Sequence, residues 1–208
     1  MGSLIYNSLM SSIQYPGGIR PNGRITADNH SGRGASLEED LNLSNDFYRE
    51  SSKALIFKKP TPIQVVKVDY PNRQHARITE AYYRTPSTTD YNGLYKGHYI
   101  DFEAKETTNR TSFPDYLVQQ HQIRHLKQVH EMGGIGFFII RFSNLNETYL
   151  ADAIRLIKQL ETSERRSIPH DWFVKNGILL EEGYMPRIAY LKAVDRLYLN
   201  DKTAKGEA

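Results

Sequence analysis

Cysteine is absent from the 208 residues of this chain. Its absence excludes disulfide bonds, zinc sites built from cysteine and a thiol nucleophile. Long hydrophobic runs are missing as well, because the longest one, residues 135–140, contains Gly136 and is far too short to cross a bilayer. The amino terminus also lacks the basic region followed by an apolar one that marks an export signal. We therefore expect a soluble protein that stays in the cytoplasm.

The chain does contain enough apolar side chains for one core. Hydrophobic residues make up 39% and aromatic residues 11% of the sequence, which is sufficient to offset the entropy cost of ordering a domain. Residues 1–32 are rich in Gly, Ser, Asn and Pro and show no periodicity, so we expect a flexible basic arm there. We expect one folded domain over residues 33–200 and a disordered tail over residues 201–208.

Positive charge is concentrated in one stretch. The formal net charge is only +3, but between residues 49 and 84 eight Lys or Arg side chains accompany three Asp or Glu. A basic stretch beside an acidic cluster favours a polyanion held close to a metal. The commoner explanation of such a stretch is plain solvated surface, so charge alone does not decide the function.

Helix and strand patterns alternate along the folded part. Ser36 stands three residues before Glu39, the spacing of a capping box, and predicts a helix that begins there. A short strand follows at residues 54–59, and three prolines interrupt residues 60–71. Because proline cannot occupy a central position of a sheet ladder, we expect these residues to form an extended excursion that projects from the sheet.

The central part of the chain predicts a strand, a helix and a second strand. Residues 114–132 read as about five turns of helix that end at Gly133 and Gly134. Residues 135–142 are a nearly continuous apolar run, typical of a strand covered on both faces. This order predicts a βαβ crossover and therefore an α/β fold with helices over a mixed sheet. Another strand is expected at residues 147–152, and covering helices at 153–160, 170–177 and 189–199.

The first strand of that crossover carries charge on one side. Ile100, Phe102 and Ala104 alternate with Asp101, Glu103 and Lys105, so the apolar residues face a helix while two carboxylates and an amine share the other face. If Lys96 and Gly97 form the preceding hairpin loop, Asp90 faces Glu103 and Asn92 faces Asp101. A turn at Asn92 and Gly93 would break this register.

Three carboxylates held this close need a cation. Without one, at least one of the carboxylates would have to take up a proton. Hard oxygen donors favour Mg²⁺ or Mn²⁺ over Zn²⁺, and the Lys105 ammonium is placed to orient an attacking water or to neutralise charge on a phosphate. The pattern therefore indicates metal-assisted phosphodiester hydrolysis. The alternative is a chance arrangement on an exposed sheet face, because the motif is short and degenerate.

Zinc held by histidine is not expected. His121 and His125 stand four residues apart, but "HQIRH" lacks the Glu that follows the first His in the helical zinc motif.

Longer blocks of sequence resemble one family. "GRGASLEEDL", "KKPTPIQVV", "EAYYRTPSTTDYNG", "YIDFEAKET", "HQIRHL" and "PRIAYLKAVD" are similar to the RecU family, Holliday-junction resolvases of Gram-positive bacteria. The resemblance covers about residues 32–200. It implies the restriction-endonuclease-like fold of the PD-(D/E)xK nuclease superfamily, a mixed sheet flanked by helices, with a stalk that projects into the centre of a four-way junction.

The same resemblance implies roles for individual residues. Asp90, Asp101 and Glu103 are similar to the metal-binding carboxylates, and Lys105 to the catalytic lysine. Glu38 and Gln122 resemble polar residues that support the catalytic site, with Gln122 also at the metal. A helix-start carboxylate that only stabilises the dipole is an equal alternative for Glu38, and a side chain that simply faces solvent is the alternative for Gln122.

The stalk is expected over about residues 58–77. The residues expected to contact DNA are Arg33, Lys58, Lys59, Lys67, Arg73, Arg77 and Thr88, and each of these side chains is individually more often plain surface. Tyr70 is an expected but weakly supported stacking residue.

The resemblance implies a Mg²⁺-dependent endonuclease, with Mn²⁺ able to replace Mg²⁺. It further implies a homodimer associated with the nucleoid that nicks four-way junctions symmetrically in recombination and repair, and that contacts the RecA recombinase. Two other functions remain open. One is a restriction-type or repair nuclease that cuts ordinary duplex DNA, and the other is a junction-binding modulator of RecA that does not cut.

Overall fold

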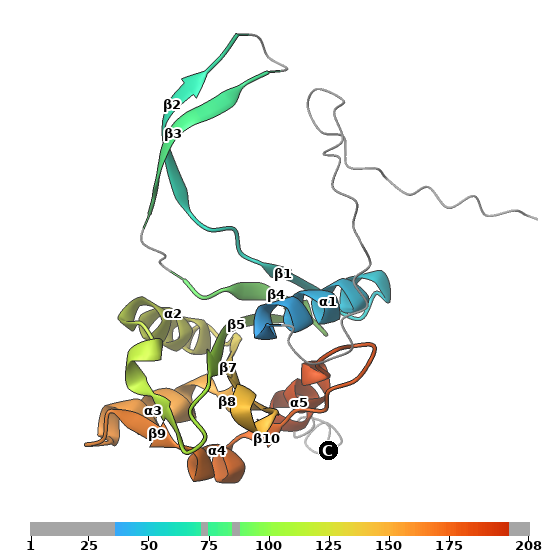
Figure 1. Ribbon diagram of the computed structural model, residues 1–208. Coiled ribbons are helices and arrows are strands. Elements are labelled where there is room, and N and C mark those ends of the chain that lie inside the picture. The colour runs from blue at the N-terminus through green and yellow to red at the C-terminus, as the bar shows by residue number, and fades with distance from the viewer. Residues whose placement is uncertain (1–35, 72–74, 85–87, 200–208) are drawn as a thin grey trace, which may run out of the picture. The chain divides into compact units, whose positions relative to one another are not determined.

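The computed structural model describes residues 36–71, 75–84 and 88–199 (Figure 1). Contacts divide the chain into two units. Of the described residues, 62–71 and 75–84 form one unit, here called the hairpin unit, and 36–61 and 88–199 form the other, the main unit. The expected arm over residues 1–32 and the expected tail over residues 201–208 lie outside the described residues.

A six-stranded sheet forms the centre of the main unit. β5 and β7 are parallel, and every other neighbouring pair in the sheet is antiparallel. The expected mixed sheet is therefore confirmed. In spatial order the strands are β1 (Leu55–Lys58), β4 (Tyr91–Tyr95), β5 (His98–Thr107), β7 (Ile135–Phe142), β8 (Glu147–Asp152) and β10 (Ile178–Leu179).

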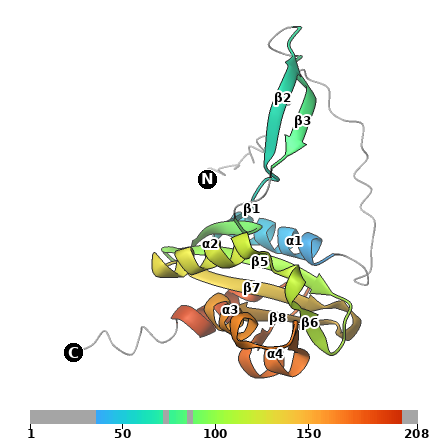
Figure 2. The same ribbon diagram turned by 90° about the vertical axis from the view of Figure 1, so that its left-hand side faces the viewer.

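Helices cover both faces of this sheet (Figure 2). Ile100 and Phe102 of β5 pack in one buried cluster with residues of the first and last helices, whereas Phe138 and Ile140 of β7 pack in a second cluster with the helices between. Every residue of β7 is buried, as its apolar sequence predicts. The helices are α1 (Leu37–Glu50), α2 (Gln120–Glu131), α3 (Ala153–Thr162), α4 (His170–Asn176) and α5 (Tyr190–Val194), with short helical turns η1 (Asp115–Leu117), η2 (Ser143–Leu145) and η3 (Asp195–Leu199).

The helix expected over residues 114–132 is shorter at its start. Residues Ser112–Pro114 form β6, which pairs with β9 (Ser167–Pro169), and η1 follows before α2 begins at Gln120. The expectation of five turns was wrong, because the chain first pairs in this small second sheet and α2 has only 12 residues. Its end is as expected, with Gly133 in the left-handed region at φ +80°.

Two local features that the sequence predicts are present in the main unit. The capping box is confirmed at α1, where the Ser36 side chain accepts from the Glu39 N–H and the Glu39 carboxylate accepts from the Ser36 N–H. The turn between β4 and β5 is Lys96–Gly97, with φ values of +48° and +79°. It pairs Asn92 with Asp101, so the register expected for a loop at this position is confirmed.

The hairpin unit is a two-stranded ribbon of β2 (Ile63–Asp69) and β3 (Arg77–Tyr83). All residues of both strands are exposed, and neither strand joins the six-stranded sheet. The expectation that the proline-interrupted segment lies outside the sheet is confirmed. The ribbon itself begins at Ile63, because Lys58 still belongs to β1. Its projection as a stalk remains a prediction.

No helix among the residues described above is both long and apolar enough to span a membrane.

A buried ion network connects α1 to β7 and to the segment between β10 and α5. Asp40 of α1 is only 4% exposed. Its carboxylate accepts from Arg141 Nη2 of β7 at 2.8 Å and from Arg187 Nε at 3.0 Å. Arg141 also donates to Glu182 at 3.1 Å. A buried charge that loses its partner is costly, so this network links the first helix to the core.

We expect Asp40→Ala to lower the free energy of unfolding by about 3 to 5 kcal/mol, because it leaves Arg141 without its buried carboxylate. The matched control is Asp46→Ala on the same helix, which removes an exposed ion pair with Arg49 and should cost less than about 1 kcal/mol. Urea unfolding measures both. Equal losses in the two variants would contradict a special role for the Asp40 network.

Candidate active site

The charged side of β5 is buried beneath α2. Asp101 and Glu103 are both 0% exposed. Gln122 and His125 of α2 contact Glu103 and Asp101, respectively. The crossover helix therefore covers the carboxylate face, while α1 and α5 pack with Ile100 and Phe102 on the other. The alternative of a chance pattern on a solvated sheet face does not fit this burial.

Four side chains surround the Asp101 carboxylate. Lys59 Nζ donates to Oδ2 at 2.8 Å, and the Tyr99 hydroxyl donates to the same oxygen at 2.7 Å. His125 Nε2 lies 3.0 Å from Oδ2, and the Thr89 hydroxyl donates to Oδ1. These residues come from the end of β1, from α2, from β5 itself and from the segment before β4. Asp101 thus joins four parts of the main unit.

Glu103 is held by one ammonium and two neutral donors. Lys105 Nζ and Gln122 Nε2 each donate to Oε1 at 2.6 Å, and the Asp90 backbone N–H donates to Oε2 at 3.1 Å. Burial raises the pKa of Glu103 from 4.5 to about 8, the Lys105 ammonium opposes that rise, and the Asp90 charge adds to it. The positive charge supplied by Lys105 therefore does not offset the effect of burial on this carboxyl.

Asp90 sits where the hairpin register predicts. Tyr91 pairs with Phe102, so Asp90 is next to Glu103 in the ladder, and the Asp90 charge acts on Glu103. The Asp90 carbonyl accepts from the Lys59 N–H at 2.7 Å. Thr88, which is half-buried, donates to the Thr89 carbonyl at 3.4 Å. The structure therefore gathers Asp90, Asp101, Glu103, Lys105 and Gln122 around one stretch of β5.

Other residues expected at the site lie elsewhere or are not described. Glu38 forms an exposed ion pair with Lys58, and its charge acts on Tyr91 together with those of Asp90 and Glu103, so its supporting role stays a prediction. Lys67 and Arg77 are exposed on the hairpin unit. Arg33 and Arg73 lie outside the described residues.

The donors suit a hard divalent cation by their chemistry. Asp90, Asp101 and Glu103 supply carboxylate oxygens, and the raised pKa of Glu103 shows a buried carboxyl short of positive charge. His121 Nε2 is buried without a hydrogen-bond partner among the described residues, and its lowered pKa, caused first by burial and then by Lys105, places it close to this group. Across the parts of the chain that the structure describes, no three Asp, Glu or His side chains already form a metal cage.

Sequence reasoning predicted none of the four side-chain contacts of Asp101; Lys59 was expected only to bind DNA, and Tyr99, His125 and Thr89 were not expected beside a carboxylate. Tyr99 lies two residues before Asp101 and so shares its sheet face, a signal that period-two alternation contains. His125 stands three residues after Gln122, on the same side of a helix. It was weighed only as a zinc ligand, although its spacing from Gln122 points toward β5. Thr89 carries no such signal, because its contact depends on how the segment before β4 is folded.

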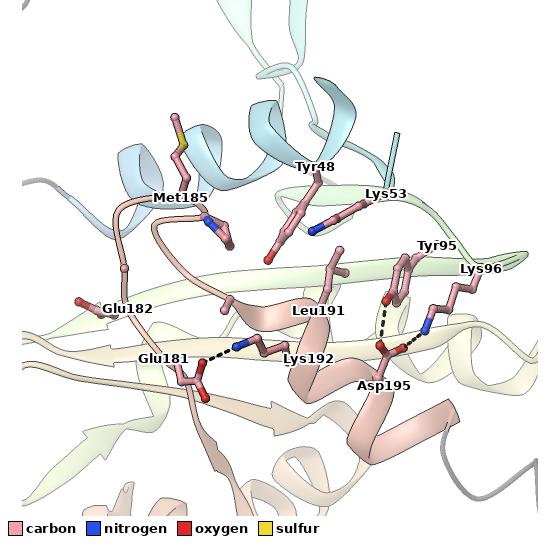
Figure 3. Close-up of a pocket in the computed structure, with 13 residues that line it drawn as sticks. Tyr48, Lys53, Tyr95, Lys96, Glu181, Glu182, Met185, Leu191, Lys192 and Asp195 are labelled. Carbon is pink, nitrogen blue, oxygen red and sulfur yellow. Dashed lines mark hydrogen bonds and ion pairs between the residues drawn. The ribbon is translucent and has the colours of Figure 1, made fainter. Parts of the chain in front are cut away.

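A separate cavity of about 680 Å³ lies over the other face of the sheet, which carries the cluster of Tyr48 and Leu191. Figure 3 shows two lysines at its wall paired with acids. Lys96 bonds to Asp195 at 2.8 Å, and Lys192 bonds to Glu181 at 2.6 Å. Because these charges balance, the cavity offers no clear preference for an anion, and it shares no lining residue with the carboxylate site.

Comparisons with known proteins place the chain among recombination proteins. The family model described as "RecU: Recombination protein U" matches residues 32–196. The chain is 52% identical over 196 residues to the Holliday junction resolvase RecU of Geobacillus kaustophilus, covering 90% of this chain and 98% of that protein. It is 50% identical over 175 residues to the protein of the same name from Staphylococcus carnosus, covering 83% of this chain and 84% of that protein.

Among solved structures, the Holliday junction resolvase Hjc of Archaeoglobus fulgidus overlaps 67% of this chain and 94% of its own. The TM-score is 0.39 and the sequence identity is 10%. We draw no conclusion from so weak a likeness.

The raised pKa of Glu103 predicts a pH-dependent loss of stability in protein kept in a chelator. A carboxyl whose pKa is about 8 in the folded chain and 4.5 otherwise binds more protons in the folded state. The stability it contributes is therefore present below pH 4.5 and is lost as the pH rises to about 8. We expect Glu103→Gln to remove this loss, so that the variant becomes relatively more stable than the wild type with rising pH.

Urea unfolding between pH 5 and pH 8.5 measures this difference. The matched control is Glu131→Gln at the exposed end of α2, which should follow the wild type. A stability difference between wild type and Glu103→Gln that stays constant across this range would show that the pKa of Glu103 is not raised.

Proposed function

The chain belongs to the RecU family of recombination proteins, and on that basis we propose that it is a Mg²⁺-dependent endonuclease that resolves Holliday junctions. The match covers most of the chain, and the curated relatives that carry the name Holliday junction resolvase are about half identical to it. Cleavage of four-way DNA by symmetric nicking is the activity that this membership favours.

One observation carries the proposal at the level of residues. Asp101 and Glu103 are fully buried on one strand; Lys105 of the same strand pairs with Glu103, and a second ammonium, Lys59, reaches Asp101 from another segment. Burying charge is expensive, and a pair of apolar residues would serve the fold better. Burial is the main cause of the raised pKa of Glu103, which reflects the free-energy cost of ionising a buried carboxyl. Such costs concentrate at catalytic sites.

In this proposal Asp90, Asp101 and Glu103 hold Mg²⁺, with Gln122 beside them. A divalent cation held by these residues would supply Lewis-acid chemistry for the attack of water on the scissile phosphate. Gln122 holds Glu103 in place through its side-chain amide. Lys105, which is partly exposed while Glu103 is not, places its ammonium at the opening of the site, where it binds a phosphate oxygen and neutralises developing charge.

DNA is bound by the basic residues around the ribbon in this proposal. Lys67 and Arg77 are exposed on the two strands of the hairpin unit, and Tyr70, 66% exposed, follows β2. Exposed ammonium and guanidinium groups bind phosphates, and an exposed ring can stack on a base. Other residues kept as DNA contacts are Arg33, Lys58, Lys59, Arg73 and Thr88.

The cut itself is proposed to be made by a homodimer. Two sites related by a two-fold axis match the symmetry of a four-way junction. Contact with the RecA recombinase and a place beside the nucleoid belong to the same proposal, and rest on family membership alone.

A nuclease of ordinary duplex DNA is the second candidate. The observation that speaks for it is the carboxylate site of the main unit, which would serve either substrate. The exposed hairpin unit would then have no purpose, so the junction remains the better supported substrate.

We expect purified protein to nick synthetic four-way junctions in Mg²⁺ and not in a chelator. Glu103→Gln and Lys105→Ala should each lower the cleavage rate by at least about a hundredfold, because one removes a metal-binding charge and the other a charge that stabilises the transition state. Gel separation of labelled strands measures the rate, and binding of the junction in a chelator confirms that the variants are folded.

Glu131→Gln, at the exposed end of α2, is the control and should cut as the wild type does. Linear duplex of the same sequence separates the two candidates. Equal cutting of duplex and junction would favour the duplex nuclease. Junction binding without any Mg²⁺-dependent cutting would instead favour the RecA modulator that does not cut.

Exposed charge on the ribbon predicts a salt effect. Replacing both Lys67 and Arg77 with Gln removes two phosphate contacts, so the slope of log binding constant against log salt should become shallower by roughly 1.4 to 1.8 units. Lys175→Gln, an exposed lysine of α4, should leave the slope unchanged. Fluorescence anisotropy with a labelled junction in a chelator measures the slopes, and identical slopes in all three proteins would exclude the ribbon from the DNA contact.

A further inference from the structure

Lys59 is fixed to the carboxylate site at three points. Its backbone N–H donates to the Asp90 carbonyl at 2.7 Å, its ammonium donates to Asp101 Oδ2 at 2.8 Å, and the same ammonium donates to the Thr89 hydroxyl at 3.1 Å. The Lys59 side chain is 18% exposed, whereas Asp101 is completely buried. The Lys59 side chain therefore contacts a fully buried carboxylate while part of the side chain remains exposed to solvent.

The same residue stands at the base of the hairpin unit along the chain. Only Pro60 and Thr61 separate Lys59 from the start of that unit. On the returning side the chain enters the site through Thr88, Thr89 and Asp90 before β4 begins. Both connections of the hairpin unit therefore end on residues that touch one another around Asp101.

An ammonium at Asp101 and a divalent cation at the same carboxylate repel each other and therefore compete for its negative charge. Each Asp101 oxygen already accepts at least one hydrogen bond, and Lys59 supplies the neutralising charge. Mg²⁺ demands near-octahedral oxygen ligands and repels a nearby ammonium. Lys59 is the lysine paired with Asp101 and comes from the segment after β1, whereas Lys105 pairs with Glu103 of its own strand.

We propose that Lys59 is an internal counter-cation that competes with the metal ion for Asp101 and is released when DNA phosphate binds its ammonium. The inference rests on the proposed function for the identity of the metal and of the substrate. In this proposal Lys59 helps to determine which DNA is cut, the four-way junction or the linear duplex. DNA whose phosphate binds the Lys59 ammonium draws that ammonium away from Asp101, so the metal ion binds more tightly. DNA that does not contact Lys59 leaves the ammonium on Asp101, so metal binding stays weak and cleavage is slow.

The competition is tested by metal binding without DNA. Mn²⁺ is titrated into the full chain, and the free ion is followed by its electron paramagnetic resonance signal. Lys59→Met keeps the length of the side chain and removes its charge, so it should bind Mn²⁺ roughly tenfold more tightly than the wild type, a coupling of ordinary size between two sites. Lys59→Arg keeps a cation and should bind Mn²⁺ as the wild type does.

Lys127→Met is the matched control for this titration. The Lys127 ammonium pairs with exposed Glu161 and not with Asp101, so Mn²⁺ affinity should be unchanged. If Lys59→Met does not fold, Lys59→Gln replaces it, because glutamine can still donate to Asp101. An affinity in the neutral variant equal to or below that of the wild type would overturn the proposal.

Cleavage supplies the second readout. The ratio of junction cutting to linear duplex cutting should fall at least about fivefold in Lys59→Met, and Lys127→Met, which removes an exposed ion pair of α2, should leave it unchanged. Loss of junction cutting with unaltered Mn²⁺ affinity would make Lys59 a simple substrate contact and reject the competition. Failure of the wild type to cut junctions would instead reject the proposed function, and the Mn²⁺ titration would still decide the role of Lys59.

Discussion

The burial of two carboxylates on one strand is the constraint on which the rest of the site depends. Asp101 and Glu103 have no access to solvent, so each must find its donors within the chain. The structure meets that demand with groups from β5, α2, the end of β1 and the segment before β4. The carboxylate face of β5 is thereby organised by polar contacts, while the opposite face of the same strand is organised by the packing of Ile100 and Phe102.

The connectivity of the main unit follows from the same constraint. β5 lies between β4, which brings Asp90 beside Glu103, and β7, whose apolar residues keep the strand deep in the sheet. The crossover helix α2 then places its polar first turns above the carboxylates and its apolar residues Ile123 and Leu126 in the core. Inserting the hairpin unit between β1 and β4 leaves this arrangement intact, because the two strands pair on either side of the insertion.

Most of the fold and the centre of the site were predictable from local patterns. The Lys96–Gly97 turn predicted the register of Asp90 and Asp101, and the apolar sequence of β7 predicted that this strand is buried. The start of α2 was not predictable, because the pairing of β6 with β9 joins residues far apart in the sequence. The contact of Lys59 with Asp101 is likewise nonlocal, so sequence placed Lys59 only among general DNA contacts. Family resemblance, and not periodicity, supplied the roles of Glu38 and Gln122.

Gln122 occupies the third position of α2, where its side-chain carbonyl accepts from the Gln119 N–H and its amide nitrogen donates to Glu103. Capping boxes accept either Glu or Gln at this position, since both offer an acceptor to the helix start. At this position only the amide of Gln can both accept from the Gln119 N–H and donate to Glu103. A glutamate would cap the helix equally well but would place another carboxylate against Glu103. The need for a donor to Glu103 therefore selects Gln, although helix formation alone accepts either residue.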